Sequence, residues 1–342
     1  MGTYDPQELV SVIVPAFNAG HFIHRTLQSI VSQTHRAMEI IVVDDGSTDD
    51  TAAQVERWSR SDPRIRLVRQ DNAGVAAARN AGIAQARGRY VAPVDADDLW
   101  APDKLEQQLT AASGADRTIG LVYGWYVQID EADRVARKYA DMPDADALLP
   151  AMCRNNILGS GSLPLLLREA VIEVGGYDAS LRARNAQGCE DYRLYFSIIE
   201  RYATAIVPAY LLGYRIHGSG MSTNVDAMMR SRAIVTAEIA ERHPLWRRKL
   251  QRGNIRVMRF TLSRLIRHRR WNEARVMIAR MMRLDAAGTM AELGSGAWLA
   301  CRLLATKIAH AAGAVTERRF AIGAMPYVLD EAAPRGHGTR HD

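Results

Sequence analysis

Short apolar runs alternate with helical patterns over the first 125 residues of the chain. Four runs are short and apolar enough to form buried strands: 9–17, 38–45, 64–70 and 89–94. Four other stretches have helical patterns: 22–31, 48–60, 74–86 and 102–113. Ser47 or Thr48 is the predicted N-cap of the second helix. This alternation predicts an α/β fold with a mostly parallel, twisted sheet and helices on both faces, as in Rossmann-like folds.

A polar segment follows each of the four predicted strands. The segments are "PAFN" (15–18), "DDGSTD" (44–49), "QDNAG" (70–74) and "DADD" (95–98). In parallel α/β sheets, ligands bind beyond the carboxyl ends of the strands. We therefore expect these segments to converge on one rim, which predicts a binding site there.

The rest of the chain divides into an irregular middle and an all-helical end. Between 126 and 225 the clearest helical pattern is "EDYRLYFSIIERY", which begins at residue 190. Beyond 226 the pattern predicts helices only, over 226–241, 245–268, 271–283 and 290–312. The tail from 334 is typical of a disordered end.

Charge is spread unevenly along the chain. The net charge is +6, yet residues 241–283 alone hold 14 Lys and Arg against two Glu, a net charge of +12. Residues 1–240 therefore carry −6, because 284–342 sum to zero. The basic stretch interleaves arginine with apolar residues. It is either the solvated face of a helical bundle or a patch that contacts anionic lipid. Nucleic acid is not the expected partner, because no base-reading module is visible.

Composition limits the cellular setting. The hydrophobic fraction of 48% is ample for a core. Cys153, Cys189 and Cys301 are odd in number, far apart and without zinc-ligand spacing, so we expect no disulfide framework and a reducing compartment. The N-terminal residues show no signal-peptide pattern, and no apolar run reaches the roughly 18 residues of a membrane span. We expect a cytoplasmic protein.

The segment "DADD" concentrates negative charge at the predicted rim. Asp95, Asp97 and Asp98 would repel one another unless a cation or hydrogen-bond donors lay among them. Mg²⁺ and Mn²⁺ typically bind one or two carboxylates together with substrate phosphates. A metal–phosphate site is therefore favoured over a cluster of helix-capping residues.

Other polar residues each have a functional and a structural interpretation. Asp44 and Asp45 either form a turn with Gly46 or accept hydrogen bonds from a base or ribose. Asn72, Gly74 and Arg79 lie at a loop-to-helix junction that is suited to anions, although Arg79 is equally compatible with an exposed surface position.

Two further candidates lie in the second half of the chain. Glu190 and Asp191 begin a helix, where a stabilising acidic first turn is the favoured interpretation. The alternative is a general base, which has to lie within reach of the proton that it takes. His217 lies in a Gly/Ser-containing loop, and is either structural or part of the site.

Three segments together resemble family 2 glycosyltransferases: "VSVIVPAFNAGHFIHRTLQSIVSQTHRAMEIIVVDDGSTDDT", "QDNAGVAAARNAGIAQARGRYVAPVDADDLWAPDKLEQQ" and "GGYDASL…CEDYRLYF". The resemblance covers roughly residues 9–220. It implies a GT-A fold and the inverting transfer of a sugar from a nucleotide-diphosphate sugar. "RHRRW" (267–271) lacks the Gln of the QxxRW motif of processive members, so we expect one sugar to be added, in cell-surface, exopolysaccharide or lipopolysaccharide assembly.

The resemblance also implies roles for individual residues. Asp95 and Asp97 match the DXD motif that binds Mn²⁺ or Mg²⁺, with His217 as a further candidate near the metal. Asp191 matches the catalytic base, and Glu190 and Asp98 are supporting candidates. The donor nucleotide is expected to contact Pro15, Ala16, Asn18, Asp44, Asp45, Asn72, Gly74, Arg79, Asp95 and Ala96.

The expected units and partners follow. Residues 1–225 would form the GT-A domain, with a nucleotide-sugar-binding half (1–125) and an acceptor half (126–225). Residues 226–330 would form a basic helical extension, and 331–342 a disordered tail. We expect a UDP-sugar in preference to a GDP- or dTDP-sugar, a glycan or polyprenyl-linked acceptor, and peripheral contact of 241–283 with the inner face of the membrane.

Three alternatives are less well supported. A receiver-like domain would use Asp95 and Lys104, but a whole strand and helix precede its acidic pair. A phosphatase of the haloacid dehalogenase type needs Thr or Val where Leu99 stands. A catalytically inactive GT-A-fold protein would retain nucleotide-sugar binding, but Asp95, Asp97 and Asp191 are all intact.

Overall fold

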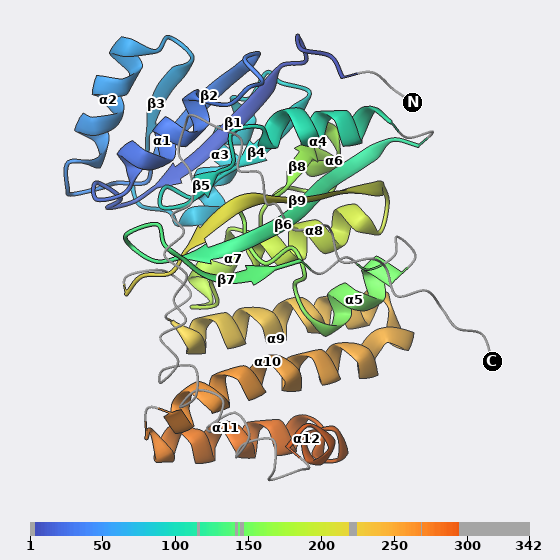
Figure 1. The fold of residues 1–342 in the computed structure, drawn as a ribbon. Coiled ribbons are helices and arrows are strands. Elements are labelled where there is room, and N and C mark those ends of the chain that lie inside the picture. The colour runs from blue at the N-terminus through green and yellow to red at the C-terminus, as the bar shows by residue number, and fades with distance from the viewer. Residues whose placement is uncertain are drawn as a thin grey trace.

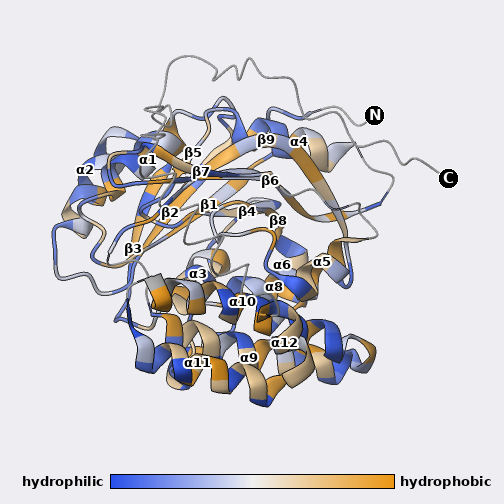
Figure 2. Ribbon diagram, turned by 60° about the horizontal axis from the view of Figure 1, so that its bottom comes forward, coloured by the Kyte–Doolittle hydropathy of each residue, from blue (hydrophilic) through white to orange (hydrophobic). Residues whose placement is uncertain are grey.

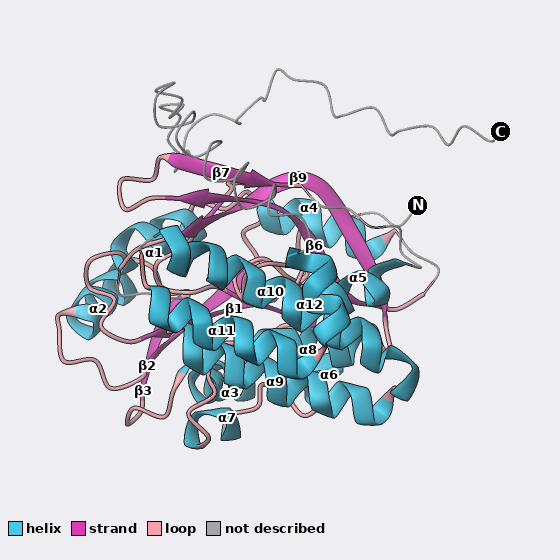
Figure 3. Ribbon diagram, turned by 90° about the horizontal axis from the view of Figure 1, so that it is seen from below, coloured by secondary structure: helices cyan, strands magenta, loops and turns pink. Residues whose placement is uncertain are grey.

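The computed structural model describes residues 4–114, 117–140, 143, 147–218, 224–267 and 269–293. Nine strands within these residues form one sheet, in the order β3-β2-β1-β4-β8-β6-β9-β5, with β7 paired to β6 (Figure 1). Below the sheet lies a layer of long helices, which Figure 3 shows from its outer side.

The first half of the fold is a parallel sheet. Its strands are β1 (Val10–Ala16), β2 (Met38–Asp44), β3 (Ile65–Arg69) and β4 (Tyr90–Pro93), and all three pairings among them are parallel. Its helices are α1 (Ile23–Val31), α2 (Thr51–Ser61), α3 (Val75–Ala84) and α4 (Lys104–Ser113). Every residue of β1 and β2 is buried, which explains their continuous apolar pattern. All eight predicted elements are confirmed.

The predicted cap of α2 is wrong. The helix begins at Thr51, and neither Ser47 nor Thr48 caps it. Instead, the Ser47 hydroxyl accepts a hydrogen bond from the backbone N–H of Asn18, and the Thr48 N–H donates to Asn18 Oδ1. These residues therefore hold the loop that follows β1, and the helix begins three residues after Thr48.

The second half of the sheet is mixed, and it contains the longest strands. β6 (Ile119–Ile129) and β9 (Ala203–Arg215) pair in parallel. The short strands β8 (Leu165–Leu167), β5 (Leu99–Trp100) and β7 (Val135–Tyr139) pair antiparallel with their neighbours. The sequence of this region has no regular alternation of strand and helix patterns, so these strands were not predicted. Its short helices are α5 (Leu148–Arg154), α6 (Arg168–Glu173), α7 (Ser180–Ala183) and α8 (Glu190–Ile199).

The helical end packs against α5 and α8 and has a small core of its own. It comprises α9 (Val225–Arg242), the 3₁₀ turn η3 (Pro244–Trp246), α10 (Arg247–Arg267), α11 (Trp271–Leu284) and α12 (Ala286–Leu293). The three predicted helices before residue 284 are confirmed, whereas 290–312 and the predicted disordered tail lie mostly or wholly outside the described residues. α9 contributes Val235 and Ile239 to the main core, whereas Met258, Leu262 and Met277 belong to a separate cluster.

The hydropathy of the helical layer is mixed along its whole length (Figure 2). At Gly253 of α10 a Cβ would lie 2.2 Å from the backbone oxygen of Cys153, so α10 and the end of α5 are in close contact. Among the described residues, no helix is both long enough and apolar enough to cross a bilayer.

Candidate active site

The loops that follow β1, β2 and β3 are tied together, as the sequence predicts. Besides its bonds to Asn18, the β2 loop holds the β3 loop through Asp45. One carboxylate oxygen of Asp45 accepts hydrogen bonds from the Ala73 N–H at 2.8 Å and the Gln70 amide at 2.7 Å. The other accepts one from the Gly74 N–H at 2.8 Å. The three loops therefore form one continuous rim.

The predicted donor-binding residues lie along this rim in different settings. Pro15 and Ala16 end β1 and are buried, whereas Asn18 and Asn72 are exposed. Asp44 is buried and accepts a hydrogen bond from the Ser47 N–H at 3.1 Å, which closes the turn at Gly46. Asn18, Gly46 and Gly74 have positive φ angles. Such conformations suit glycine and are tolerated by asparagine, so they allow these tight turns.

The three carboxylates of "DADD" have separate partners. Asp95 forms an ion pair with Arg79, and the carboxylate of Asp97 lies 2.7 Å from Nε2 of His217. Both carboxylates are partly exposed at the rim. Asp98 is fully buried. Ala96, which lies between Asp95 and Asp97, is also buried. Its backbone oxygen accepts a hydrogen bond from the Thr26 hydroxyl at 2.9 Å, which anchors the loop to α1.

Asp98 holds the loop in place from inside the protein. One carboxylate oxygen accepts a hydrogen bond from the Ser162 hydroxyl at 2.5 Å, and the other accepts one from the Arg215 N–H at 2.8 Å. Burial raises the pKa of Asp98 well above its ordinary value, and the charges of Asp97 and Asp95 add to this effect. Because both oxygens already have protein partners, this geometry fits the supporting role.

Arg79 is a buried residue of the site and not a surface arginine. It lies on α3, is 3% exposed, and its guanidinium stacks over the ring of Tyr177 at 5.1 Å. Its pKa is raised despite burial, chiefly because of the carboxylate of Asp95. Arg79 therefore remains a cation beneath the rim.

Replacing Gly161 by Ala should displace Arg79. A Cβ at Gly161 would lie 2.5 Å from a terminal nitrogen of Arg79, so the guanidinium must move away from Asp95. We expect a loss of about 1–3 kcal/mol in the free energy of unfolding and weaker donor binding. Chemical denaturation and donor titration measure the two effects. Gly114→Ala is the control, because its nearest contact would be 3.8 Å away. Equal behaviour of both variants would contradict the prediction.

His217 reaches the rim from the end of β9. The hydrogen bond with Asp97 raises the pKa of the imidazole, and the ring of Phe22 lies 4.9 Å from it. Arg215 precedes this loop. Its buried guanidinium pairs with Asp133 at 2.6 Å and donates to the backbone oxygen of Asp97 at 2.6 Å. Arg215 thus connects the end of β9 to the "DADD" loop.

Asp191 lies in the first turn of α8. One carboxylate oxygen accepts a hydrogen bond from the Tyr192 N–H at 2.6 Å, and the other accepts one from the side-chain amide of Asn156 at 3.2 Å. Burial raises the pKa of Asp191, while the charge of Arg79 opposes that shift. A raised pKa strengthens a carboxylate as a proton acceptor.

Glu190 points into the protein. It is 3% exposed, and its carboxylate accepts a hydrogen bond from the Gly188 N–H at 2.7 Å. Burial raises its pKa as well. This position favours a structural task at the start of α8 over proton transfer at the rim.

The rim offers carboxylate and imidazole groups to a divalent ion. In the part of the chain that the structure describes, no three His, Cys, Asp or Glu side chains form a metal cluster. The side chains of Asp95 and Asp97 are nevertheless partly exposed, and His217 lies 2.7 Å from the carboxylate of Asp97. Mg²⁺ and Mn²⁺ require few protein ligands when phosphates and waters complete the shell. The residues therefore fit an ion that binds together with a diphosphate.

Sequence reasoning missed three residues that organise the site: Asn156, Ser162 and Arg215. Asn156 and Ser162 lie in "NNILGSGS", a segment without a strong pattern. Ser162 accepts a hydrogen bond from the Asp95 N–H at 2.9 Å and donates one to Asp98. These contacts join residues more than 60 positions apart, so only the adjacent Gly and Ser residues signalled a loop at this place.

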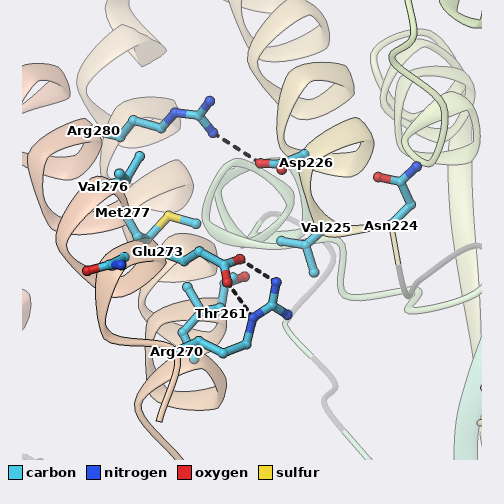
Figure 4. Close-up of a pocket in the computed structure, with 11 residues that line it drawn as sticks. Asn224, Val225, Asp226, Thr261, Arg270, Glu273, Val276, Met277 and Arg280 are labelled. Atoms are coloured by element: carbon cyan, nitrogen blue, oxygen red, sulfur yellow. Dashed lines mark hydrogen bonds and ion pairs between the residues drawn. The ribbon is translucent and has the colours of Figure 1, made fainter. Parts of the chain in front are cut away.

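A cavity of about 700 Å³ lies apart from the rim, between α9, α10 and α11 (Figure 4). Its charged side chains pair with each other: Arg280 with Asp226 at 3.4 Å, and Arg270 with Glu273. None of the predicted site residues lines it.

Comparison with solved structures identifies the fold. A crystal structure of Staphylococcus aureus TarS, residues 1–349, matches with a TM-score of 0.55 and 17% identity, covering 72% of this chain and 69% of that one. The mannosyltransferase PcManGT from Pyrobaculum calidifontis, solved with GDP-Man and Mn²⁺, matches with a TM-score of 0.54 and 23% identity, covering 91% and 83%. The fold is the GT-A fold of glycosyltransferases.

Sequence comparison then gives the family. The family model described as glycosyl transferase family 2 matches residues 11–175. A putative teichuronic acid biosynthesis glycosyltransferase, TuaG of Bacillus subtilis, is 30% identical over 69% of this chain and 90% of its own length. The β-1,3-glucosyltransferase WfgD of Escherichia coli is 31% identical over 70% and 89%. The chain belongs to glycosyltransferase family 2 and is a glycosyltransferase.

Proposed function

We propose that this protein transfers one sugar, with inversion, from a nucleotide-diphosphate sugar to a hydroxyl group of a cell-surface polysaccharide precursor. The position of Arg79 carries the proposal. Its guanidinium pairs with Asp95 of the DXD motif, and its charge also acts on Asp191. A buried cation thus connects the residues proposed for the leaving group with the residue proposed as base.

The donor nucleotide would bind along the rim. The turns at Asp44 and Asp45 fix the backbone from Gln70 to Gly74, and the exposed side chains of Asn18 and Asn72 are within reach of a nucleoside lying there. Pro15, Ala16 and Ala96 are buried and would support this surface from beneath. Among the relatives, WfgD is named as a UDP-Glc enzyme and TarS was solved with UDP-GlcNAc, whereas PcManGT was solved with GDP-Man. A UDP-sugar is favoured, ahead of GDP- and dTDP-sugars.

Asp97, Asp95 and His217 would hold Mn²⁺ or Mg²⁺. When bound, the ion neutralises the charge that develops on the departing diphosphate. Arg79 contributes a second, permanent positive charge through its pairing with Asp95. The loop that contains Asp95 and Asp97 is held in place from inside the protein by Asp98, Ser162 and Arg215.

Asp191 would act as the general base. The acceptor oxygen forms a bond to the anomeric carbon and gives its proton to the carboxylate, while the bond from that carbon to the diphosphate breaks and its electron pair leaves with the diphosphate. Inversion requires attack from the side opposite the leaving group. Orientation of the acceptor should supply much of the rate, because a neutral hydroxyl is a weak nucleophile.

The acceptor is proposed to be a glycan or a polyprenyl-linked sugar. TuaG is named for teichuronic acid biosynthesis, and WfgD is named as acting on a GlcNAc-diphosphoundecaprenol. The absence of the QxxRW motif supports the addition of one sugar per encounter.

The basic helical stretch 241–283 is proposed to contact the cytoplasmic face of the membrane. In α11, Ala274, Met277 and Met281 are buried, which turns the opposite face outward. That outward face carries the exposed Arg275 and Arg283, and Trp271 at the start of the helix is 56% exposed. Figure 1 places α11 at the edge of the molecule farthest from the first four strands. Such a face suits an anionic lipid surface.

Reversing charge on this face should weaken membrane binding. The variant Arg275→Glu/Arg283→Glu is expected to lose about 2 kcal/mol of binding free energy, at about 1 kcal/mol per basic residue near an anionic surface. Sedimentation with vesicles that contain phosphatidylglycerol, and with purely zwitterionic vesicles, measures the change. Arg57→Glu/Arg60→Glu on α2 is the control, because both arginines are exposed far from α11. Negligible sedimentation of the wild-type protein with both vesicles would dismiss the membrane contact.

A thermal-shift panel tests the proposed donor directly. Ligand that binds only the folded state raises the melting temperature. UDP-, GDP- and dTDP-sugars are compared with and without Mn²⁺. We expect a UDP-sugar to give the largest shift, and the metal to increase it. A panel in which no nucleotide sugar shifts the melting temperature would contradict the proposed function.

A further inference from the structure

The segment between α5 and β8 contacts both parts of the proposed catalytic machinery. We refer to residues 156–162 as the bridging segment. At one end, Ser162 binds the backbone of Asp95 and the carboxylate of Asp98. In the middle, Gly161 leaves the space that Arg79 fills. At the other end, the side chain of Asn156 reaches Asp191 at 3.2 Å. One short segment thus spans the distance between the DXD loop and the proposed base.

The hydrogen bond of Asn156 is directed at Asp191 alone. Its Nδ2 donates to Asp191 Oδ2, and its Oδ1 is buried without a hydrogen-bond partner among the residues that the structure describes. Rotating the amide by 180° would place two oxygens against each other, so the carboxylate fixes its orientation. A side chain with a role only in folding would be expected to use both ends of its amide, because a buried unpaired oxygen is costly.

Asp191 is consequently held from two sides. Tyr192 N–H donates to Oδ1 at 2.6 Å, and Asn156 donates to Oδ2. Donors to a carboxylate favour its ionised form. The other titratable groups that act on it come from several elements: Arg79 on α3, Asp95 on the loop after β4, Tyr177 before α7, and Cys189, Glu190 and Tyr195 at or in α8. Asn156 differs from these groups because its amide carries no charge. It donates to Oδ2, whereas the backbone of α8 holds Oδ1.

We propose that Asn156 is a positioning residue for the catalytic base. It aims Oδ2 of Asp191 at the acceptor hydroxyl, and it keeps that carboxylate ionised and in register with the DXD loop through the bridging segment. The inference rests on the proposed function, because it assumes that Asp191 accepts the proton.

The test compares Asn156→Ala and Asn156→Asp with the control Asn155→Ala. Asn155 is the adjacent, exposed residue. The readouts are donor affinity and the pH dependence of nucleoside diphosphate release from the nucleotide sugar selected by the thermal panel. Activity should rise with pH as Asp191 loses its proton. Losing the amide donor, or adding a second carboxylate, raises the pKa of Asp191, so this rise should move to higher pH.

We expect Asn156→Ala to lower kcat by about tenfold, as a misaligned base does, with donor affinity unchanged. Asn156→Asp should move the pH profile further, and Asn155→Ala should match the wild type. A lower kcat with the pH profile unmoved in both variants would overturn the inference, as would a loss of donor affinity equal to the loss of kcat. Because Asn156→Asp preserves the shape of the side chain, it remains informative if Asn156→Ala fails to fold. A wild-type protein without turnover would instead contradict the proposed function.

Discussion

Asp191→Asn is expected to lower sugar transfer by about 10²–10⁴-fold, the usual contribution of a general base. The substitution retains the size of the side chain and one of its two accepting oxygens, but it removes the group that accepts the proton. Binding of the donor should remain unchanged, because the rim that holds the nucleotide contains none of the atoms of Asp191. Initial rates of transfer and a donor titration measure the two effects on the same preparation.

Glu190→Gln is the matched comparison for this variant. Both acids start α8, but Glu190 is 3% exposed and bonded to Gly188. We expect Glu190→Gln to affect the melting temperature more than the rate. If Glu190→Gln abolished transfer while Asp191→Asn retained it, the assignment of the base would have to be reversed.

Asp97→Ala is expected to abolish metal-dependent donor binding. Even partners outside the first coordination shell cost about 10–100-fold in metal affinity, so the loss of a proposed ligand should exceed 100-fold. Asp97 also holds His217, and the substitution should release that side chain from the rim. Calorimetric titration of the nucleotide sugar at increasing Mn²⁺ measures the dependence. An unchanged titration would remove Asp97 from the metal site.

Asp98→Asn separates binding from stability. Both oxygens of Asp98 are held inside the protein, by Ser162 and by the backbone of Arg215. We expect this variant to unfold at a lower temperature, because an amide nitrogen would face the Arg215 N–H or the Ser162 hydroxyl in place of an accepting oxygen. Its dependence on Mn²⁺ should persist. A selective loss of the metal effect in Asp98→Asn would show that the two acids have exchanged roles.

The first half of the fold follows closely from its sequence pattern. β1, β2 and β4 are buried along their whole length, so continuous apolar runs predict them, whereas β3 at the edge of the sheet is only partly buried. β6 and β9 are different. Their register shifts around Gly124, where a Cβ would lie 2.8 Å from Leu211, and β9 contains Pro208. Such irregular pairing disturbs the period-two pattern on which strand prediction depends.

The sequence predicts only those parts of the site whose position follows from the topology of the sheet. The polar loops converge because parallel strands end on one edge of the sheet, and their acids were therefore found. The pattern could not separate Asp97 from Asp98, because that distinction depends on the burial of Asp98 beneath Ser162. Arg79 was ambiguous for the same reason. Its surroundings come from Gly161 and Tyr177, which lie about 80 and 100 positions further along the chain.

The close contact at Gly253 has a practical consequence for shortening the chain. Because α9 shares the main core and α10 lies directly against the end of α5, a fragment that stops at residue 225 would expose apolar surface beside Asn156. Limited proteolysis should therefore release no stable piece ending there. Asp191 lies beyond residue 175, where the matched family region ends. Because α9 shares the main core, we expect the smallest active fragment to extend into the helical layer.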